Sequence, residues 1–318
     1  MEFAQVGIDQ LPVERPAPSR LSFSAFSDYV DCSEKFRLSR IYKLPEPFTY
    51  CATVAGGIIH EITAEIDLMV LDGADYEFAQ SMLDGDFEER FHQEIIDLTA
   101  KGVEVKPSGP KREVMSEAGG PGKKDETWWM HYGPLFIERW CNWVQESGFM
   151  ILNDGGDIKG VELEVSFDLE GTPVVGSVDR LGLLDGELQV IDLKFGTREQ
   201  ESEIQPLTYA LAVAKQYELT PAKVGYWKPS VLEQGSRTKY LPNGGLKDAI
   251  DVTPEDLAFA ESIYPAVDRG ITNSVFLPSP NANCRFCTME EYCRARRGRH
   301  SSEVPIVTKI TPRNTGNA

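Results

Sequence analysis

A β-hairpin is the strongest structural signal in this chain, and it lies within residues 176–194. Asp185 and Gly186 separate two apolar-rich runs, and this pair favours a two-residue type I′ turn between antiparallel strands. Counting outward from the turn places Asp179 directly opposite Asp192. Directly opposed residues have Cβ atoms about 4.5–5.5 Å apart, and like charges there repel each other. The hairpin therefore predicts a pair of carboxylates whose repulsion a divalent cation would remove.

A lysine joins these carboxylates on the second strand. Because strand side chains alternate, Lys194 shares the face of Asp192, while Leu193 points to the other face. Hard oxygen ligands suit Mg²⁺ or Mn²⁺, and a lysine beside them can orient or polarise a water that attacks a phosphodiester. The alternative is a solvent-facing strand on which the acids and the lysine neutralise one another.

A helix is predicted after the hairpin, over the apolar run that follows Gln205. Pro206 favours the first helical position, so Gln205 is expected at the N-cap or nearby. Tyr209 lies one turn further on the same side. An amide and a phenol near a helix N-terminus suit phosphate or base contacts. An ordinary amphipathic helix is the alternative.

The order of these residues resembles a known family. Residues 55–60 end in His60, and the chain then runs through Asp179, residues 192–194, Gln205 and Tyr209. This order is similar to that of the RecB-like branch of the PD-(D/E)XK nuclease superfamily. The resemblance implies a metal-dependent DNA nuclease in which Gln205 and Tyr209 belong to the DNA-contacting helix.

The resemblance also implies roles at the metal site. The side chains of His60, Asp179 and Asp192 and the carbonyl of Leu193 would be metal ligands, and Lys194 would orient the nucleophilic water. Without the resemblance, His60 would be a partly buried polar residue on a helix.

A second candidate metal site consists of cysteines near the C-terminus. Cys284, Cys287 and Cys293 lie within ten residues of one another, and three thiolates need a fourth ligand, for which Cys32 is the candidate. A 4Fe-4S cluster and a structural zinc site both accept four cysteines, so the number of ligands does not distinguish them.

The family resemblance favours the iron-sulfur cluster. RecB-like nucleases with such a cluster, including the fourth CRISPR-associated protein type and the AddB nuclease, use one N-terminal and three C-terminal cysteines that flank the nuclease core. This chain departs from them at Ser33, where the family commonly has proline. Cys51 and Cys141 stand apart from these cysteines and are predicted to be reduced, buried thiols.

The chain has six cysteines, for which a disulfide framework is the remaining alternative. The first ten residues lack the basic start and apolar core of a signal peptide. No run approaches the roughly 18 apolar residues of a membrane span. We therefore expect a cytoplasmic protein without membrane contact, in which thiols stay reduced and clustered cysteines bind metal.

Hydrophobic residues make up 41% of the chain and charged residues 26%, which is ordinary for a folded protein. We expect an α/β fold with a mixed central sheet flanked by helices, a restriction-endonuclease-like core, and an iron-sulfur clasp formed by the N- and C-terminal parts. The expected domains are an N-terminal arm at 1–20, a single nuclease domain at 21–300 and a tail at 301–318. Within the domain we expect a helical part at 21–155, the nuclease core at 156–230 and a C-terminal helical and cysteine-cluster part at 231–300.

Three further segments bear on the site. A strand predicted over residues 161–167 carries Glu164 on the face of Glu162, where Glu164 could add a carboxylate. Residues 101–126 are rich in Pro, Gly and charges and predict a long loop, either a lid or DNA-gripping loop or a disordered insertion. A helix ending near Gly148 carries four tryptophans that pack against the sheet or stack on bases: Trp128, Trp129, Trp140 and Trp143.

Charge opposes the nuclease interpretation. A formal net charge of −18 disfavours long-range attraction to DNA, whose binding depends on phosphate neutralisation. Either a basic patch or a solvated tail is expected from the arginines near the cysteine cluster, which are Arg285, Arg294, Arg296, Arg297 and Arg299. The acidity also indicates a narrow substrate channel with few contacts.

The sequence thus predicts a metal-dependent DNA exonuclease that acts on strands with free ends, and the resemblance implies that the substrate is single-stranded DNA. The resemblance implies phage recombination, DNA repair or CRISPR spacer processing, with recombination or CRISPR adaptation proteins as partners and a bacterial host as one setting. The alternatives are a catalytically silent iron-sulfur DNA-binding or assembly module and a zinc-stabilised interaction protein.

Overall fold

The predicted hairpin is present in the computed structural model, which describes residues 13–108, 124–156, 158–195, 204–232, 236, 239–311 and 313. Its strands are β7 (Thr172–Leu184) and β8 (Glu187–Leu193), which pair antiparallel with Leu184 opposite Glu187. Asp185 and Gly186 have φ values of +54° and +81°. Both turn residues are therefore left-handed, as a type I′ turn requires, and the predicted register is confirmed.

The chain divides into two compact units. The sheet unit comprises residues 47–165 and 176–260, and the terminal unit comprises residues 1–46, 166–175 and 261–318. The sequence had led us to expect one nuclease domain from residue 21 to residue 300. Local sequence patterns do not report contacts between the two ends of a chain, and such contacts build the terminal unit.

The sheet is mixed, as predicted. In the sheet unit its order is β10-β9-β8-β7, in which β8 runs parallel to β9 and the other two pairs are antiparallel, and β5 and β6 also pair with β7. Residues 245–251 were not expected to form a strand. This mixed sheet also contains β5 (Met150–Ile151), β6 (Val161–Leu169), β9 (Lys223–Lys228) and β10 (Gly245–Asp251).

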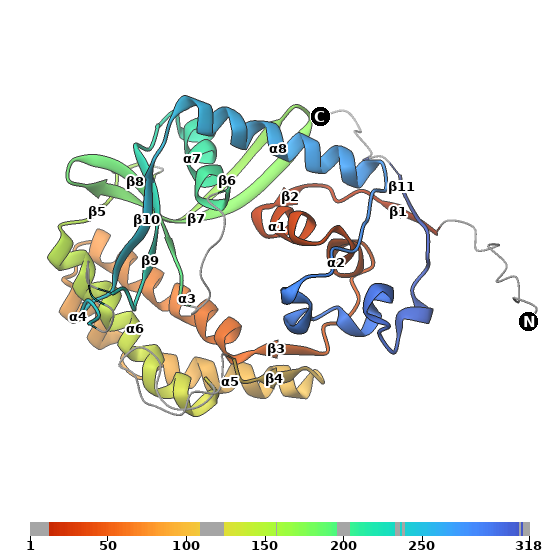
Figure 1. The fold of residues 1–318 in the computed structure, drawn as a ribbon. Helices are drawn as coiled ribbons and strands as arrows, with labels where there is room; N and C mark the ends of the chain where they lie inside the picture. Colours follow the sequence, from red (N-terminus) through yellow and green to blue (C-terminus); the bar gives the residue numbers. More distant parts are fainter. Residues whose placement is uncertain are drawn as a thin grey trace, which may run out of the picture. The chain divides into compact units, whose positions relative to one another are not determined.

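Five helices of the described chain belong to the sheet unit (Figure 1): α3 (Cys51–Leu71), α4 (Tyr76–Met82), α5 (Asp86–Ala100), α6 (Glu126–Ser147) and α7 (Ile204–Tyr217). The core formed by α3, α5 and α6 includes Ile191 and Leu193 of β8. Trp128, Trp129 and Trp140 are buried in this core, so the predicted packing role is confirmed for most of the tryptophans. Helix α6 ends before Gly148, whose φ of +72° suits a left-handed helix end.

The predicted long loop over residues 101–126 contains a short strand. Strand β4 (Glu104–Lys106) pairs parallel with β3 (Phe48–Tyr50). Residues 109–123 lie outside the described residues, so the predicted lid or insertion stays a prediction.

The terminal unit joins the two ends of the described chain. Strand β1 (Val13–Pro16) pairs parallel with β11 (Thr308–Thr311), so the predicted arm and tail both contain a strand. The ring of Phe26 stacks on that of Tyr264, with centroids 4.2 Å apart. The other elements of this unit are β2 (Leu21–Ser22), α1 (Phe23–Asp31), α2 (Ser33–Phe36), a π-helical turn (Arg37–Ile41), most of α8 (Pro254–Thr272), and four 3₁₀ turns (Ala282–Phe286, Glu290–Tyr292, Arg294–Arg296 and Ser301–Glu303).

Within the described ranges, every helix is too short or too polar to cross a membrane.

Candidate active site

The hairpin brings Asp179 and Asp192 together. Arg180 pairs with Ile191, and one step further along both strands lie the two aspartates. The backbone N–H of Leu193 donates to Asp179 Oδ2 over 2.8 Å. Asp192 is fully buried, and its burial together with the charge of Asp179 raises its pKa to about 6. A nearby positive charge is therefore required to stabilise the ionised form of the Asp192 carboxyl.

Lys194 supplies one positive charge. Its Nζ lies 2.6 Å from Asp192 Oδ2, while Leu193 is buried in the core on the opposite face, so the predicted alternation is confirmed. Burial acts to lower the pKa of Lys194, but the carboxylates of Asp192 and Asp179 outweigh burial and raise it. Lys194 is therefore held as a cation at neutral pH.

His60 reaches the same site from α3. This helix buries Ile58, Ile59 and Ile62, which leaves the His60 side chain 28% exposed. The Nδ1 atom of His60 lies 3.6 Å from Asp179 Oδ2. Burial disfavours protonation of His60, but Asp179 and other nearby carboxylates outweigh it and raise the pKa.

Glu162 completes this group, and our sequence analysis had named Glu164 instead. Glu162 Oε1 lies 3.7 Å from His60 Nδ1, and ligand atoms of His60, Glu162 and Asp179 all lie within 4.8 Å of one another. Glu164 is exposed, and its backbone carbonyl accepts from the Tyr217 hydroxyl at 2.8 Å and from Gln216 Nε2 at 3.3 Å. Strand alternation places Glu162 and Glu164 on the same face, so Glu162 was an available candidate. Alternation alone does not tell which of the two glutamates lies beside α3.

The backbone of Glu162 is unusual. Its φ is +43°. A positive φ costs free energy for a residue with a Cβ atom, and residues in such conformations are concentrated at functional sites. The Ser177 hydroxyl donates to Glu162 Oε2 over 3.0 Å, and Arg180 Nη1 lies 3.3 Å from Oε1. Burial acts to raise the pKa of Glu162, but His60 and Arg180 outweigh it and lower the pKa. Glu162 is therefore held as a carboxylate.

Gln205 and Tyr209 contact Asp192. Within the described residues α7 begins at Ile204, so Gln205 lies in its first turn, close to the predicted N-cap. Its Nε2 lies 3.3 Å from Asp192 Oδ1 and 2.6 Å from the Tyr209 hydroxyl, which also hydrogen-bonds to Asp192. Tyr209 is only 4% exposed. These contacts hold Asp192 in place, and the DNA-contacting role of both residues stays a prediction.

Sequence reasoning did not select a buried ion pair beside the site. Arg180 Nε lies 2.6 Å from Asp67 Oδ2, and both side chains are fully buried. The Trp140 indole donates to Asp67 Oδ2 and the Tyr76 hydroxyl to Oδ1, each over 2.9 Å. The available signal was an arginine inside an otherwise apolar strand, because such a residue is almost never buried unless it is paired.

The residues at this site fit a divalent cation. Asp192 Oδ2 is buried and has no hydrogen-bond donor of suitable geometry among the described residues, although the Lys194 ammonium lies beside it. Carboxylate oxygens and an imidazole nitrogen are ligands that suit Mg²⁺ and Mn²⁺. His60, Glu162 and Asp179 could hold a cation, with Asp192 and the Leu193 carbonyl adjacent.

A comparison with protein families agrees with this chemistry. A family model described as the PD-(D/E)XK nuclease superfamily matches residues 20–294. The chain belongs to this superfamily. Nucleases of the PD-(D/E)XK superfamily use divalent metals, and their substrate is DNA.

Two phage proteins are similar to this superfamily member. The Gene 69 protein of Mycobacterium phage L5 is 24% identical over 299 residues, which cover 86% of this chain and 95% of that protein. The Gene 69 protein of Mycobacterium phage D29 is 30% identical over 158 residues, 49% of this chain and only 56% of that protein. Among solved structures, a candidate exonuclease from Eubacterium rectale has a TM-score of 0.36 at 12% identity, over 84% of this chain and 92% of that one.

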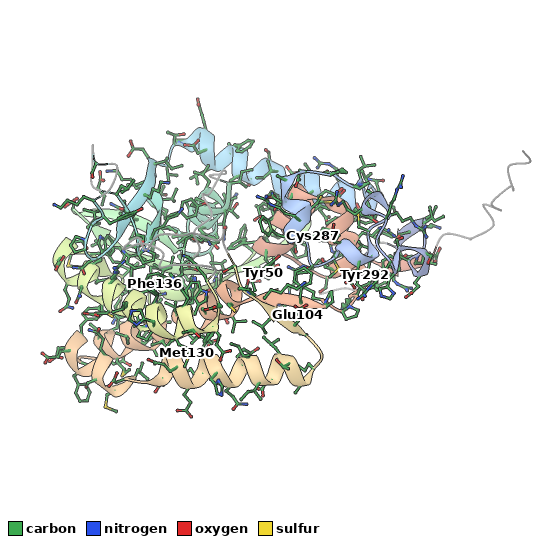
Figure 2. All side chains as sticks on the ribbon, turned by 60° about the horizontal axis from the view of Figure 1, so that its bottom comes forward. Tyr50, Glu104, Met130, Phe136, Cys287 and Tyr292 are labelled. Atoms are coloured by element: carbon green, nitrogen blue, oxygen red, sulfur yellow. The ribbon has the colours of Figure 1, made fainter. Side chains whose placement is uncertain are left out.

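The four clustered cysteines belong to the terminal unit (Figure 2 labels Cys287). Each sulfur accepts at least one backbone N–H: Cys32 from Ser279, Cys284 from Asn281, Cys287 from Met289, and Cys293 from Ala295 and Arg296. Cys287 and Cys293 pack against a small core that contains Met289. Hydrogen bonds to sulfur stabilise thiolates, which are the form that binds metal.

The other two cysteines are buried as predicted. Cys51 is 3% exposed and Cys141 is fully buried, and both are free thiols. Burial raises the pKa of Cys51 to about 11 and also raises that of Cys141. Both are therefore neutral thiols at neutral pH.

The predicted basic patch is partly neutralised within the terminal unit. Arg296 pairs with Glu290 at 3.1 Å and Arg299 with Glu291 at 2.7 Å. Arg294 donates to a backbone carbonyl. These contacts leave less positive charge for DNA than the sequence suggested.

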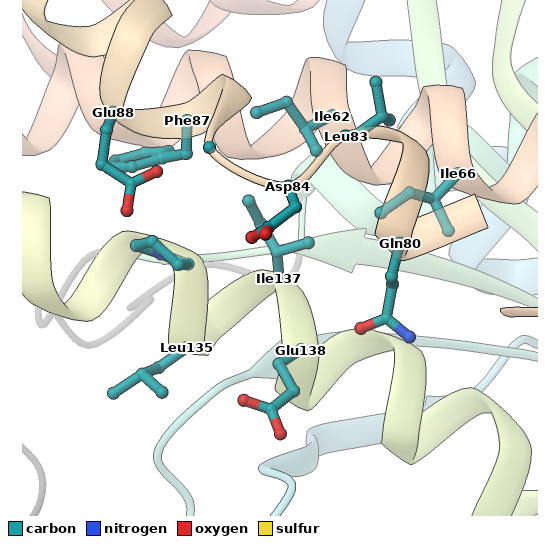
Figure 3. A pocket seen from close by; sticks show the side chains of 12 residues that line it. Ile62, Ile66, Gln80, Leu83, Asp84, Phe87, Glu88, Leu135, Ile137 and Glu138 are labelled. Atoms are coloured by element: carbon teal, nitrogen blue, oxygen red, sulfur yellow. The ribbon is translucent and has the colours of Figure 1, made fainter. Parts of the chain in front are cut away.

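A pocket of about 240 Å³ lies elsewhere in the sheet unit, against α3, α5 and α6 (Figure 3). Ile62, Ile66 and Ile137 supply apolar side chains, and Asp84 and Glu138 supply carboxylates. None of the residues described above as site members lines it. The candidate chemistry therefore belongs to the hairpin and α3, not to this pocket.

Glu162 and Glu164 provide a matched test of the cation site. We expect Glu162→Gln to lower Mn²⁺ affinity about tenfold or more, because it removes one anionic ligand. Glu164→Gln, two residues along the same strand, should leave the affinity unchanged. Calorimetric titration with Mn²⁺ measures both, and an equal effect of the two substitutions would contradict the assignment.

The pH dependence of Mn²⁺ binding follows from Asp192. Its pKa is raised to about 6, so below that pH the carboxyl holds a proton that a cation must displace. Affinity should fall by up to about tenfold per pH unit below about 6, and protonation of His60, whose pKa is also raised, extends the decrease to higher pH. Titrations at about pH 5 and about pH 8 measure the change, with circular dichroism as the control for folding. Equal affinities at both pH values would contradict the raised pKa.

Proposed function

We propose that this superfamily member is a metal-dependent DNA exonuclease of the RecB-like branch, acting on single-stranded DNA with free ends. The observation that carries the proposal is the buried Asp179–Asp192 pair with Lys194 beside it and His60 within 3.6 Å of Asp179. A protein that only binds DNA has little reason to bury two carboxylates side by side, because each anion costs free energy to desolvate.

The roles of the residues follow from their positions. His60, Glu162, Asp179, Asp192 and the Leu193 carbonyl are the ligands for Mg²⁺ or Mn²⁺. When bound, the cation supplies Lewis-acid polarisation of the phosphodiester and lowers the pKa of water.

Lys194 is the catalytic lysine. Its ammonium is fixed by Asp192, and it orients the attacking water and stabilises the negative charge that develops on the phosphate. Gln205 and Tyr209 keep Asp192 in position, and the partly exposed first turn of their helix contacts the DNA strand.

A single-stranded substrate is consistent with the charge of the chain. With a net charge of −18, broad wrapping of a duplex is disfavoured, and a strand end that enters a narrow site needs few phosphate contacts. Similarity to two Mycobacterium phage proteins supports a phage setting, in which phage recombination or DNA repair is the proposed role. CRISPR spacer processing is the further pathway that fits a RecB-like nuclease, and recombination or CRISPR adaptation proteins are the partners.

The cysteines of the terminal unit hold a 4Fe-4S cluster that clasps the two ends of the chain. One cysteine from the N-terminal part of the chain and three from the C-terminal part would supply its four thiolate ligands, and each of these sulfurs accepts a backbone N–H.

Cleavage of end-labelled single-stranded DNA by anaerobically purified protein tests the activity. We expect Mn²⁺- or Mg²⁺-dependent degradation, with Lys194→Ala lowering the rate about 10²–10³-fold because a group that stabilises developing charge is lost. Asp192→Ala should abolish the activity. Lys223→Ala, which removes a lysine from an exposed ion pair with Glu187, is the control and should cleave normally. A folded wild-type protein that cleaves no end or strand type would favour the silent DNA-binding or assembly module.

The colour and iron content of the anaerobic protein test the cluster. The wild-type protein should be brown, and Cys284→Ser should lose the colour and the iron because one ligand is removed. Cys141→Ala, at a buried cysteine of the sheet unit, should keep both. A colourless protein with stoichiometric zinc would instead support the zinc-stabilised interpretation.

A further inference from the structure

Arg180 contacts every element that carries a member of the His60–Glu162–Asp179 group. Its Nη1 lies 3.3 Å from Glu162 Oε1 on β6 and donates over 2.7 Å to the carbonyl oxygen of Asp179 on β7. Its remaining hydrogen bonds are to α3, the helix that carries His60, and its guanidinium also lies 5.5 Å from the ring centroid of Trp140 on α6. A single guanidinium on β7 therefore joins the neighbouring strand β6 to α3, which is distant from both strands in the sequence.

The contact with α3 leads to His60 through one side chain. Arg180 Nη2 donates to Thr63 Oγ1 over 3.1 Å, and the Thr63 hydroxyl in turn donates to the backbone carbonyls of Ile59, at 2.8 Å, and His60, at 3.1 Å. Thr63 and Arg180 are both fully buried. The guanidinium that contacts Glu162 is thus also connected, through Thr63, to the backbone of His60.

Asp67 fixes the guanidinium itself. It accepts from Arg180 Nε over 2.6 Å and from Trp140 and Tyr76. A buried ion pair is weak evidence for stability, because apolar residues of similar volume often stabilise a protein equally well. What apolar residues cannot supply is a rigid fork of donors that reaches several acceptors at once.

We infer that Arg180 is a positioning residue of the cation site, which holds His60, Glu162 and Asp179 at ligand spacing and is itself oriented by Asp67. This inference rests on the proposed function only in requiring that the site binds a divalent cation. Arg180 touches no substrate and takes no part in the chemistry. Outer partners of metal ligands typically change metal affinity or activity about 10–100-fold when they are removed.

Two variants of Arg180 test the inference by Mn²⁺ affinity. Arg180→Lys keeps the buried charge beside Asp67 but loses the fork. Arg180→Met with Asp67→Asn removes both charges together and leaves an amide oxygen for Tyr76 or Trp140. In both, we expect Mn²⁺ to bind about 10–100-fold more weakly by calorimetric titration, while circular dichroism and thermal unfolding report a folded protein.

The matched control is a second arginine anchored on α3. Arg90 pairs with Glu65 at 2.6 Å and with Asp86 at 2.8 Å, and neither partner belongs to the site. Arg90→Met with Glu65→Gln should leave Mn²⁺ affinity unchanged. Saturating Mn²⁺ should restore cleavage in the Arg180 variants, because their catalytic groups are intact, but not in Lys194→Ala.

The possible outcomes separate this inference from the proposed function. Mn²⁺ affinity within about twofold of wild type in the folded Arg180 variants would overturn the positioning role. Loss of folding in both variants would also overturn it, because Arg180 would then be purely structural. A wild-type protein that binds Mn²⁺ but cleaves no DNA would overturn the proposed nuclease, and the affinity comparison would still decide the role of Arg180.

Discussion

The repulsion between two buried carboxylates is the constraint around which this site is built. Asp179 and Asp192 face each other because a two-residue turn sets the register of their strands, and burial then raises the pKa of Asp192 to about 6. Lys194 offsets part of that cost, and a cation would offset the rest. The neighbouring contacts of Gln205 and Leu193 serve to hold these two carboxylates in place.

The site uses two layers of charge. The inner layer consists of groups that can bind a cation, with His60 and Glu162 beside Asp179. The outer layer is the Arg180–Asp67 pair, which lies in the apolar core between α3 and β7. Because both layers are tied to rigid helices and strands, ligand spacing is set before any cation arrives, which lowers the free energy cost of binding it.

The terminal unit brings together segments from the two ends of the described chain. Within this unit β1 pairs with β11, its partner across nearly the whole sequence. Joining such distant segments costs chain entropy that increases with loop length. A metal cluster bound by the four thiolates, each of which accepts a backbone N–H, would link the two ends of the chain and offset part of this entropy cost.

Local sequence determined the features that depend on neighbouring residues. The Asp185–Gly186 turn fixed the hairpin register and thereby the Asp179–Asp192–Lys194 arrangement, because strand alternation and turn geometry act over a few residues. The tryptophan helix and its end at Gly148 follow from the same short-range rules. Only the tertiary structure decided that Glu162 and not Glu164 joins His60, that Arg180 of β7 pairs with Asp67 of α3, and that β1 pairs with β11. These contacts join residues far apart in the sequence, and no periodicity within one strand or helix encodes their partner.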